Sequence, residues 1–557
     1  MQVIDAIAGL SRCQLCSSAD DRPPPDAGPA VHLAPHPTQA PLFIDRLDLI
    51  IFPQLFETHK NWQKMKNPIS SALAQELASQ LDASTQLVTP DSPDYEASIA
   101  RWSDTAIKRA GAVALPQTAE EVSKLVSFAS KHQLEIAVKG GGHSTGGTSA
   151  SEGGLVIDLA KMRQVTVDPE KKIIVAQGGA LWGDVDDAAA QHGLATVGGT
   201  VSHTGIGGLT LGGGFGWLSG LYGSVIDNLV GAKVVVADGR ILDASNSENQ
   251  DLFWAIRGAG HNFGVTVEFR YQAYEQSRPV YGGTLVFTPD KLNSIIETLN
   301  ERHRNPDPRG AFHCVFAKSP GAPGPVVIVV LFFNGDEDAA KKYYASVLDL
   351  GPVAANLASM PYPQMNRLLN DMAHPGGRKA LKGATFSPPI RTEFAQWLWE
   401  EFTTKISQEP DLEKTFLSIE FYDMTKAAAV PVEATAFPTR GIYQAGILGL
   451  SWTDPTKDEQ FRAWGRHLQA KCREEIRQTV VQPKSGAILE YANYSERKIY
   501  REPSSRRDGI PANTETAGDL TYTAPFGTNQ KRLTQLKAKF DPQCLFHKTN
   551  PITPEVA

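Results

Sequence analysis

Apolar residues recur along the chain with two periods, and each period predicts a different kind of element. Between residues 119 and 129, Val122, Leu125 and Val126 fall on one face of a helix because they are three and four positions apart. Residues 134–138 form a short apolar run that leads into a cluster of glycines, which predicts a strand followed by a loop.

The same patterns continue further along the chain. Residues 233–242 predict a hairpin, because two apolar runs flank an Asp-Gly turn at Asp238. Residues 326–333 form an unbroken apolar run that is too short to span a bilayer and predicts a buried strand. Further strands are predicted at 155–159, 173–176 and 282–287, and further helices at 182–192 and 338–348.

The order of these elements indicates more than one domain. A chain of 557 residues is too long for one ordinary core, so two or more packed units are expected. Strands alternate with helices from about residue 280 to 480, which predicts a separate α+β domain. Residues 17–40 are rich in Pro, Asp, Ala and Ser, which predicts a loose tail, and the folded region is expected to begin near residue 65.

Charge and composition exclude several partners. Acidic residues outnumber basic ones by 61 to 54, and no long Lys/Arg run occurs, so nucleic acid is not an expected partner. A membrane partner is not expected either, and the sequence makes no prediction of the oligomeric state. The N-terminus lacks a basic region and a sustained apolar stretch, which favours a cytoplasmic location.

The cysteines predict neither a disulfide framework nor a metal centre. Their number, five, is odd in a long chain. Cys13 and Cys16 have the spacing of half a zinc or redox site, but no second pair follows them. We therefore predict no metal site.

A glycine run that follows the predicted strand at 134–138 has two interpretations. Its Gly142-x-Ser144-x-Gly146 pattern is that of a hydrolase nucleophile elbow, which requires a helix directly after the serine. Residues 145–154 are poor helix formers and lead into another strand, so a hydrolase that uses Ser144 is disfavoured. The alternative is that the loop wraps a phosphate and that His143 holds a ligand.

A second glycine-rich segment, residues 198–216, favours that alternative. So many positions without side chains indicate backbone amides that lie against a long, flat ligand and its phosphates. Neither segment fits the Gly-x-Gly-x-x-Gly pattern or the Walker pattern, so a Rossmann domain and a P-loop are disfavoured.

Taken in order, these motifs resemble those of the berberine bridge enzyme-like oxidoreductases of the vanillyl-alcohol oxidase group. The resemblance covers about residues 70 to 278 and 480 to 551. The segments that carry it are Gly140-Gly141-Gly142-His143-Ser144, residues 198–216, Asp227-Asn228-Leu229-Val230, Val236-Ala237-Asp238-Gly239, residues 251–265, Tyr491-Ala492-Asn493-Tyr494, residues 526–533 and residues 541–546.

The resemblance implies an α+β fold with a two-lobed FAD-binding domain of the PCMH type and an α+β substrate domain with an antiparallel sheet. It implies an N-terminal extension at 1–64, an FAD-binding domain at 65–278 with its core at about 109–278, and a substrate-binding domain at 279–480. A C-terminal segment, 481–557, would complete the FAD-binding domain.

The resemblance also implies how FAD is held. In the family, the histidine after the glycine run is usually bonded to the 8α-methyl group of FAD, and His143 occupies that place. Many members have a second link through a cysteine, but here that residue is Val201, so attachment through His143 alone is implied. The implied FAD contacts are His143, Gly140, Gly141, Gly142, Ser144, Gly199, Thr200, Gly205, Gly207, Gly208, Gly212, Gly214, Gly264, Val265, Tyr491 and Asn493.

Departures from the family affect the expected proton acceptor. Phe215 stands where many plant members have a tyrosine that assists deprotonation, and a phenylalanine transfers no proton. Tyr494 matches a position where the family often has its base, so it is the implied catalytic base; a core aromatic role stays open. The implied substrate contacts are His203, Tyr443 and Gln444, and Thr204 stands at the position that gates oxygen.

The function expected from this resemblance is that of an FAD-linked oxidase. It would take a hydride from a C–H next to a hydroxyl or amine of a small, partly apolar metabolite, with O2 as the electron acceptor, and would serve secondary-metabolite biosynthesis. The alternatives that stay open are a flavin-dependent cyclase without net redox change, a carbohydrate oxidase, a non-catalytic flavin-binding protein and a serine hydrolase.

Overall fold

The computed structural model of the chain describes residues 67–319, 322–479, 491–494 and 526–555. The predicted extension at 1–64, with Cys13 and Cys16, lies outside the described residues, as does most of the segment at 481–557.

The glycine loop of His143 belongs to a small sheet in the order β1-β2-β4-β3. Strands β2 (Ala112–Leu115), β4 (Leu155–Asp158) and β3 (Ile136–Lys139) run parallel, and β1 (Gln86–Val88) is antiparallel to β2. Helix α4 (Ala119–Lys131) begins at a capping box formed by Thr118 and Glu121. The loop with His143 connects β3 to β4, so it leaves the end of a buried strand.

A second sheet of five antiparallel strands has the order β5-β6-β10-β8-β9. The predicted hairpin is confirmed, with Gly239 at a φ of 84° in its turn. The strands are β5 (Val165–Asp168), β6 (Ile173–Gln177), β8 (Leu229–Val235), β9 (Ile241–Ser245) and β10 (Val265–Gln272). Helices α2 (Ser71–Gln80) and α3 (Tyr95–Ile99) pack with the first sheet. The helices α5 (Trp182–Ala190), α6 (Ile206–Leu211), α7 (Ser219–Tyr222) and α8 (Gln250–Ala259) follow in the chain, and the short strands β7 (Leu194–Ala195) and β11 (Tyr274–Glu275) pair with each other.

The region after residue 279 contains the expected antiparallel sheet. It has seven strands in the order β15-β12-β14-β13-β17-β18-β16. The strands are β12 (Val280–Phe287), β13 (Gly310–Lys318), β14 (Pro325–Phe333), β15 (Ala354–Met360), β16 (Arg378–Phe386), β17 (Phe416–Tyr422) and β18 (Gln444–Trp452). The predicted helix at 338–348 is broken at Tyr344 into α10 (Glu337–Tyr343) and α11 (Ala345–Leu348).

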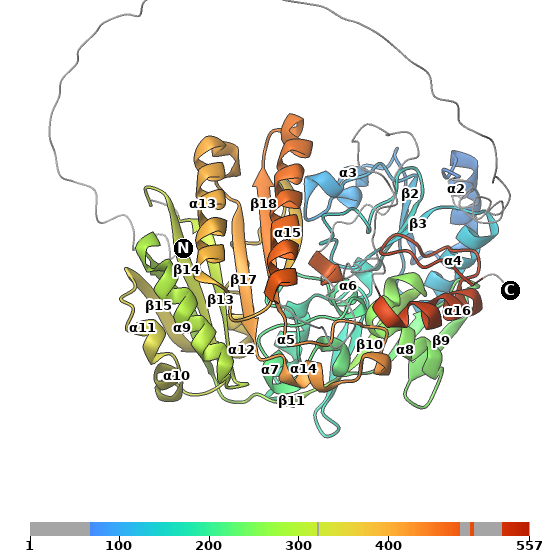
Figure 1. Cartoon of the computed structure of the whole chain (residues 1–557). Coiled ribbons are helices and arrows are strands. Elements are labelled where there is room, and N and C mark those ends of the chain that lie inside the picture. The colour runs from blue at the N-terminus through green and yellow to red at the C-terminus, as the bar shows by residue number, and fades with distance from the viewer. Residues whose placement is uncertain (1–66, 320–321, 480–490, 495–525, 556–557) are drawn as a thin grey trace, which may run out of the picture. The chain divides into compact units, whose positions relative to one another are not determined.

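The two faces of this sheet have different roles because side chains alternate along each strand. One face carries Leu417, Ile419 and Phe421 of β17 and packs against helices that lie over the sheet (Figure 1). These helices are α9 (Leu292–Arg304), α13 (Thr392–Gln408) and α15 (Asp458–Thr479). The opposite face carries the intervening residues of β17, which line the cavity described below.

The buried residues of the C-terminal stretch 530–552 pack against the N-terminal sheets, whereas residues 491–494 also contact β16 of the seven-stranded sheet. Helix α16 (Gln530–Phe540) lies beside α8 (Figure 1). Within it, the fully buried ammonium of Lys537 donates to Asp541 and to the main-chain oxygens of Asn262 and Phe546, at 2.6–2.7 Å. No helix in the described part of the chain is both long and apolar enough to cross a membrane.

Candidate active site

One large cavity lies between the glycine segments and the open face of the seven-stranded sheet. It offers about 350 Å³ to the centres of water molecules. The glycines that line it are Gly140, Gly141, Gly142, Gly178, Gly199, Gly205, Gly207, Gly208 and Gly264. Main-chain atoms therefore form much of its wall, as the sequence pattern predicts for a flat ligand.

The two glycine segments touch each other at Gly141 and Gly205. A Cβ atom added to Gly141 would lie 2.5 Å from the main-chain nitrogen of Gly205, so neither position accommodates a side chain. Gly142 has a φ of 69°, a conformation that glycine adopts without strain. A Cβ added to Gly208 would instead meet nothing within 4 Å, so this position opens onto free space.

These observations fit FAD. A wall of main-chain amides with a left-handed turn suits a pyrophosphate, and a long, largely apolar cavity suits the flavin and adenine rings. Ser144, Thr200, Tyr491 and Asn493 add polar groups along the same wall. The residues that would hold the cofactor thus surround one continuous space.

His143 reaches this space from the loop between β3 and β4. Its Nε2 lies 2.8 Å from Nδ1 of His203, and its ring stacks on Trp102 with 4.7 Å between centroids. Burial lowers the pKa of His143 to about 3, with the charges of His203 and Lys379 adding to the effect. The imidazole is therefore neutral at physiological pH and able to act as a nucleophile.

Trp102 in turn ties the loop to the second half of the chain. Its indole nitrogen donates to the carbonyl of Ala373 at 2.6 Å, and its main-chain carbonyl accepts from Gly376 at 3.0 Å. Leu369, Met372 and Ala373, from the segment after helix α12 (Tyr362–Met365), also line the cavity. This segment covers the part of the cavity that contains His143.

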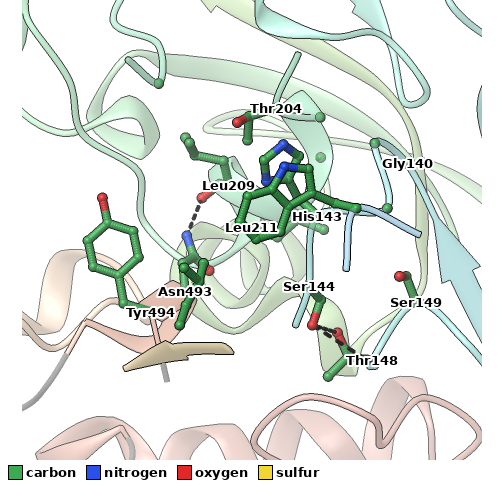
Figure 2. A pocket seen from close by; sticks show the side chains of 18 of the residues that line it. Gly140, His143, Ser144, Thr148, Ser149, Thr204, Leu209, Leu211, Asn493 and Tyr494 are labelled. Atoms are coloured by element: carbon green, nitrogen blue, oxygen red, sulfur yellow. Dashed lines mark hydrogen bonds between the residues drawn. The ribbon is translucent and has the colours of Figure 1, made fainter. Parts of the chain in front are cut away.

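The short C-terminal motif at residues 491–494 docks onto the second glycine segment. The amide nitrogen of Asn493 donates to the carbonyl of Leu209 at 3.0 Å and to the hydroxyl of Tyr491 at 2.7 Å, and Figure 2 shows the first of these contacts. Gly214 donates to the Tyr491 hydroxyl at 3.1 Å. At Gly212 a Cβ would lie 2.1 Å from the Asn493 side chain, so this glycine makes room for the motif.

Tyr494, the predicted base, lines the cavity beside Asn493 (Figure 2). Its hydroxyl donates to Glu420 of β17, at 3.4 and 3.3 Å from Oε1 and Oε2. Burial raises the pKa of Tyr494 well above 10, and the charge of Glu420 raises it further. The site therefore does not stabilise the phenolate that a tyrosine base would need.

Glu420 is the ionisable group that the sequence analysis missed. Its side chain is buried, and burial raises the pKa of this carboxyl to about 8, against the lowering effect of the Tyr494 hydrogen bond. Ser418 and Tyr422 line the cavity at the neighbouring positions of the same face. The sequence Phe-Leu-Ser-Ile-Glu-Phe-Tyr at 416–422 could have indicated this group, because its polar residues occupy alternate positions of an otherwise apolar strand and therefore share one face.

A second polar pair lies next to Glu420. His313 of β13 stands directly opposite Glu420 in the strand pairing, and its Nε2 lies 2.7 Å from the hydroxyl of Tyr422. Burial lowers the pKa of His313 to about 3, and its ring stacks on Trp217 at 4.6 Å. Phe215 packs against Tyr422, Tyr491 and Tyr494, so it contributes only apolar surface at this point.

Six predicted site residues are not among those that line the cavity. Gln444 is 1% exposed, and its amide exchanges two hydrogen bonds with the main chain of Tyr422, so it serves the sheet and not the substrate. Tyr443 lies just before β18, and His203 contacts His143, which lines the cavity. The six are Gly212, Gly214, Val265, His203, Tyr443 and Gln444.

Ser144 does not stand on a nucleophile elbow. The chain from Ser144 to β4 contains turns and no helix, and the Ser144 hydroxyl accepts from Thr148 at 2.9 Å (Figure 2). No described histidine or carboxylate hydrogen-bonds to it. Ser144 therefore lacks the hydrogen-bonded base that a serine hydrolase needs to activate its nucleophile.

Comparison with known proteins agrees with the site. A family model for an FAD binding domain matches residues 110–245, and one for berberine and berberine-like proteins matches residues 515–553. The FAD-linked oxidoreductase pgmH of Aspergillus terreus is 35% identical over 475 residues, which cover 83% of this chain and 92% of that protein.

Solved structures share the fold. The 6-hydroxy-D-nicotine oxidase of Arthrobacter nicotinovorans has a TM-score of 0.67 at 25% identity, over 85% of this chain and 99% of that one. The xylooligosaccharide oxidase of Myceliophthora thermophila has a TM-score of 0.70 at 21% identity, over 87% and 100%. The chain therefore belongs to the berberine bridge enzyme-like family of FAD-linked oxidoreductases.

Proposed function

We propose that the enzyme oxidises a small, partly apolar metabolite by taking a hydride from a C–H next to a hydroxyl or amine. The observation that carries this proposal is the Glu420–Tyr494 pair, which sets a proton acceptor into the cavity. Bound FAD supplies the hydride-accepting ring, and the chain supplies position and proton transfer.

The protonation chemistry supports a relay and not a tyrosine base. Tyr494 keeps its proton, because burial raises its pKa well above 10. Glu420, with a pKa of about 8, is ionised in part of the molecules near neutral pH. A substrate hydroxyl would give its proton to the Tyr494 oxygen while Tyr494 gives its own to Glu420, so the carboxylate is the final acceptor.

The lining around this pair supports a substrate with a hydrophobic body. Val315, Leu369, Phe416 and Ile447 are apolar, and they share the cavity wall with Glu420. The hydroxyls of Ser418 and Tyr422 would add polar contacts at defined points. An apolar metabolite of secondary metabolism fits this lining better than an oligosaccharide, which carries hydroxyls on every side.

We also infer that His143 alone carries the flavin covalently and that O2 is the electron acceptor. His143 and Val201 both line the cavity, and only the imidazole is able to form such a bond. Thr204 lines the cavity as well and is small, which suits access of O2 to the cofactor. A covalent bond would retain the cofactor and raise its reduction potential.

The deciding experiment mixes the purified enzyme anaerobically with a panel of benzylic alcohols, hydroxylated aromatics, secondary amines and xylobiose. Bleaching of the flavin by an apolar alcohol or amine, followed by hydrogen peroxide on admission of air, is the expected result. Bleaching by xylobiose alone would establish a carbohydrate oxidase. Product formation under argon without net bleaching would establish a cyclase.

Denaturation tests the covalent bond separately. Protein precipitated with acid should stay yellow, and a peptide that contains His143 should carry the mass of FAD, whereas His143→Ala should release its FAD. A colourless wild-type precipitate would remove the covalent bond from the proposal and leave the oxidation chemistry standing.

A further inference from the structure

His313 and Tyr422 form a polar pair in the cavity that the proposed proton relay does not use. Nε2 of His313 lies 2.7 Å from the Tyr422 hydroxyl, and both residues line the cavity although only 3% of each is exposed. Nδ1 of His313 has no hydrogen-bond partner among the described residues. The Tyr422 hydroxyl both donates and accepts, and its contact with His313 uses one of these roles. The pair therefore has unused hydrogen-bonding capacity next to the cavity.

The pair is neutral, which determines the kind of group that it binds. Burial lowers the pKa of His313 to about 3, so the imidazole carries no charge at neutral pH. Burial raises the pKa of Tyr422 well above 10, and the charge of Glu420 raises it further. Two neutral groups that donate and accept suit a hydroxyl or a carbonyl group. A carboxylate would be buried beside Glu420 without a counter-charge, which is unfavourable.

The strand pairing fixes the distance between this pair and the proton acceptor. His313 of β13 directly faces Glu420 of β17, and facing side chains of antiparallel strands have Cβ atoms about 5 Å apart. Tyr422 follows two positions after Glu420 and therefore points to the same face. Phe215 contacts a member of each polar pair, with 5.4 Å between ring centroids to Tyr422 and 6.0 Å to Tyr494. An apolar surface thus connects two polar points that one small aromatic molecule reaches together.

We propose that His313 and Tyr422 anchor a second polar group of the substrate, and that the substrate is a benzylic alcohol with a neutral hydroxyl or carbonyl group on its ring. The reacting hydroxyl lies against Tyr494, and the ring lies along Phe215. The second group hydrogen-bonds to the His313–Tyr422 pair and takes no part in the reaction. The inference rests on the oxidation proposed above and deepens it, because it names the substrate class of the same site.

A second anchor acts on orientation as well as on affinity. A substrate held only at its reacting hydroxyl rotates about that contact, whereas two contacts fix the plane of its ring. The anchor itself is held in place, because Trp217 stacks on His313 and also on Phe332 of the neighbouring strand β14. An analogue with a methyl group in place of the second polar group would leave the buried pair unsatisfied, which costs about tenfold in affinity.

The test measures binding to the full-length, FAD-loaded enzyme by isothermal titration calorimetry under argon. The probes are meta-hydroxybenzaldehyde, meta-methylbenzaldehyde and meta-carboxybenzaldehyde, which are at the oxidation level of the product. The meta position suits the spacing of about 5 Å between facing side chains. We expect the wild type to bind the hydroxy probe about tenfold more tightly than the methyl probe, and to bind the carboxy probe most weakly.

Two variants remove one half of the pair each and keep an aromatic ring in the wall. In Tyr422→Phe and in His313→Phe, the preference for the hydroxy probe should fall to about threefold or less. Tyr344→Phe is the matched control, because the Tyr344 hydroxyl donates to Ala311 of the same strand β13 from the helical face of the sheet. It should keep the wild-type preference. The preference is a ratio within one protein, so a general loss of affinity does not imitate the effect.

The outcomes separate this inference from the oxidation on which it rests. Equal affinity of the wild type for the hydroxy and methyl probes would overturn the anchor, and so would a preference that survives in both variants of the pair. Loss of the preference in Tyr344→Phe as well would show a general effect of the sheet and would also overturn it. Bleaching of the flavin by meta-hydroxybenzyl alcohol tests the oxidation; its absence, with the binding preference intact, would refute the oxidation and leave the anchor standing.

Discussion

The hydroxyl of Tyr494 lies 3.3 Å from the nearer carboxylate oxygen of Glu420, although the two residues are 74 positions apart in the sequence. Replacement of Glu420 by glutamine keeps the shape of the side chain and removes the proton acceptor. We expect flavin reduction by the substrate to slow by about 10²–10⁴-fold, measured by anaerobic stopped flow.

Glu413→Gln is the matched control for this variant, because Glu413 is an exposed acid in an ion pair with Lys318, shortly before β17. It should reduce its flavin at the wild-type rate. An unchanged rate in Glu420→Gln would mean that hydride transfer needs no protein base.

The pH dependence of the same rate should report the Glu420 carboxyl. Its pKa is raised to about 8, so the carboxylate that accepts the proton becomes more populated as the pH rises through that value. The rate of flavin reduction should therefore increase from pH 6 to pH 9 with a midpoint near 8, and the increase should be absent in Glu420→Gln. A rate that falls with rising pH would contradict the assignment.

Tyr494→Phe removes one hydroxyl and keeps the ring that packs against Phe215 and Tyr491. The Tyr494 hydrogen bond lowers the pKa of Glu420, so its loss should move the pH profile to higher values. The maximal rate should fall by about tenfold or more because the relay is interrupted. A variant with the wild-type profile would place Tyr494 outside the path of the proton.

Two glycines with opposite surroundings test the cofactor wall. Gly208→Ala points a methyl group into free space, so the protein should fold with normal thermal stability and lose most of its bound FAD. Gly141→Ala brings a methyl group within 2.5 Å of Gly205, so it should impair folding as well as FAD content. Flavin absorbance per protein and thermal unfolding distinguish the two, and full FAD content in Gly208→Ala would contradict the placement of the cofactor.

A buried ion pair connects the segment before β18 to the flavin-binding half. Arg440 and Asp227 meet at 2.8 Å with 1% and 10% of their side chains exposed. Asp227→Asn leaves the arginine charge buried and should cost about 3–5 kcal/mol in denaturant unfolding. The exposed pair Arg466–Glu459 is the control, and Glu459→Gln should change stability by less than about 1 kcal/mol. Equal effects would show that Asp227 is solvated.

Local pattern was sufficient to predict much of the fold. The apolar face of α4 and the Asp-Gly hairpin between β8 and β9 depend on neighbours in sequence, so they could be predicted. The break at Tyr344 could not, because its ring packs into the core and its hydroxyl donates to Ala311 and Phe332 of the sheet. Tertiary contacts of that kind override helical periodicity.

The part of the site that main-chain atoms form could be predicted from the sequence. The glycines that line the cavity could be recognised in the sequence, because an ordinary structural loop rarely needs so many positions without side chains. Glu420 and His313 come from two strands more than a hundred residues apart, so only strand pairing brings them together. The family resemblance implies that Gln444 contacts the substrate, yet its amide is hydrogen-bonded to the main chain of Tyr422 within the sheet.

Side chains of β17 alternate between the two faces of the sheet, so one strand contributes both to the core beneath the helices and to the wall of the cavity. Leu417, Ile419 and Phe421 support the helical layer, while Ser418, Glu420 and Tyr422 face the cavity. Because the two sets point in opposite directions, a change of substrate preference through residues 418 and 422 leaves the packing beneath the helices untouched.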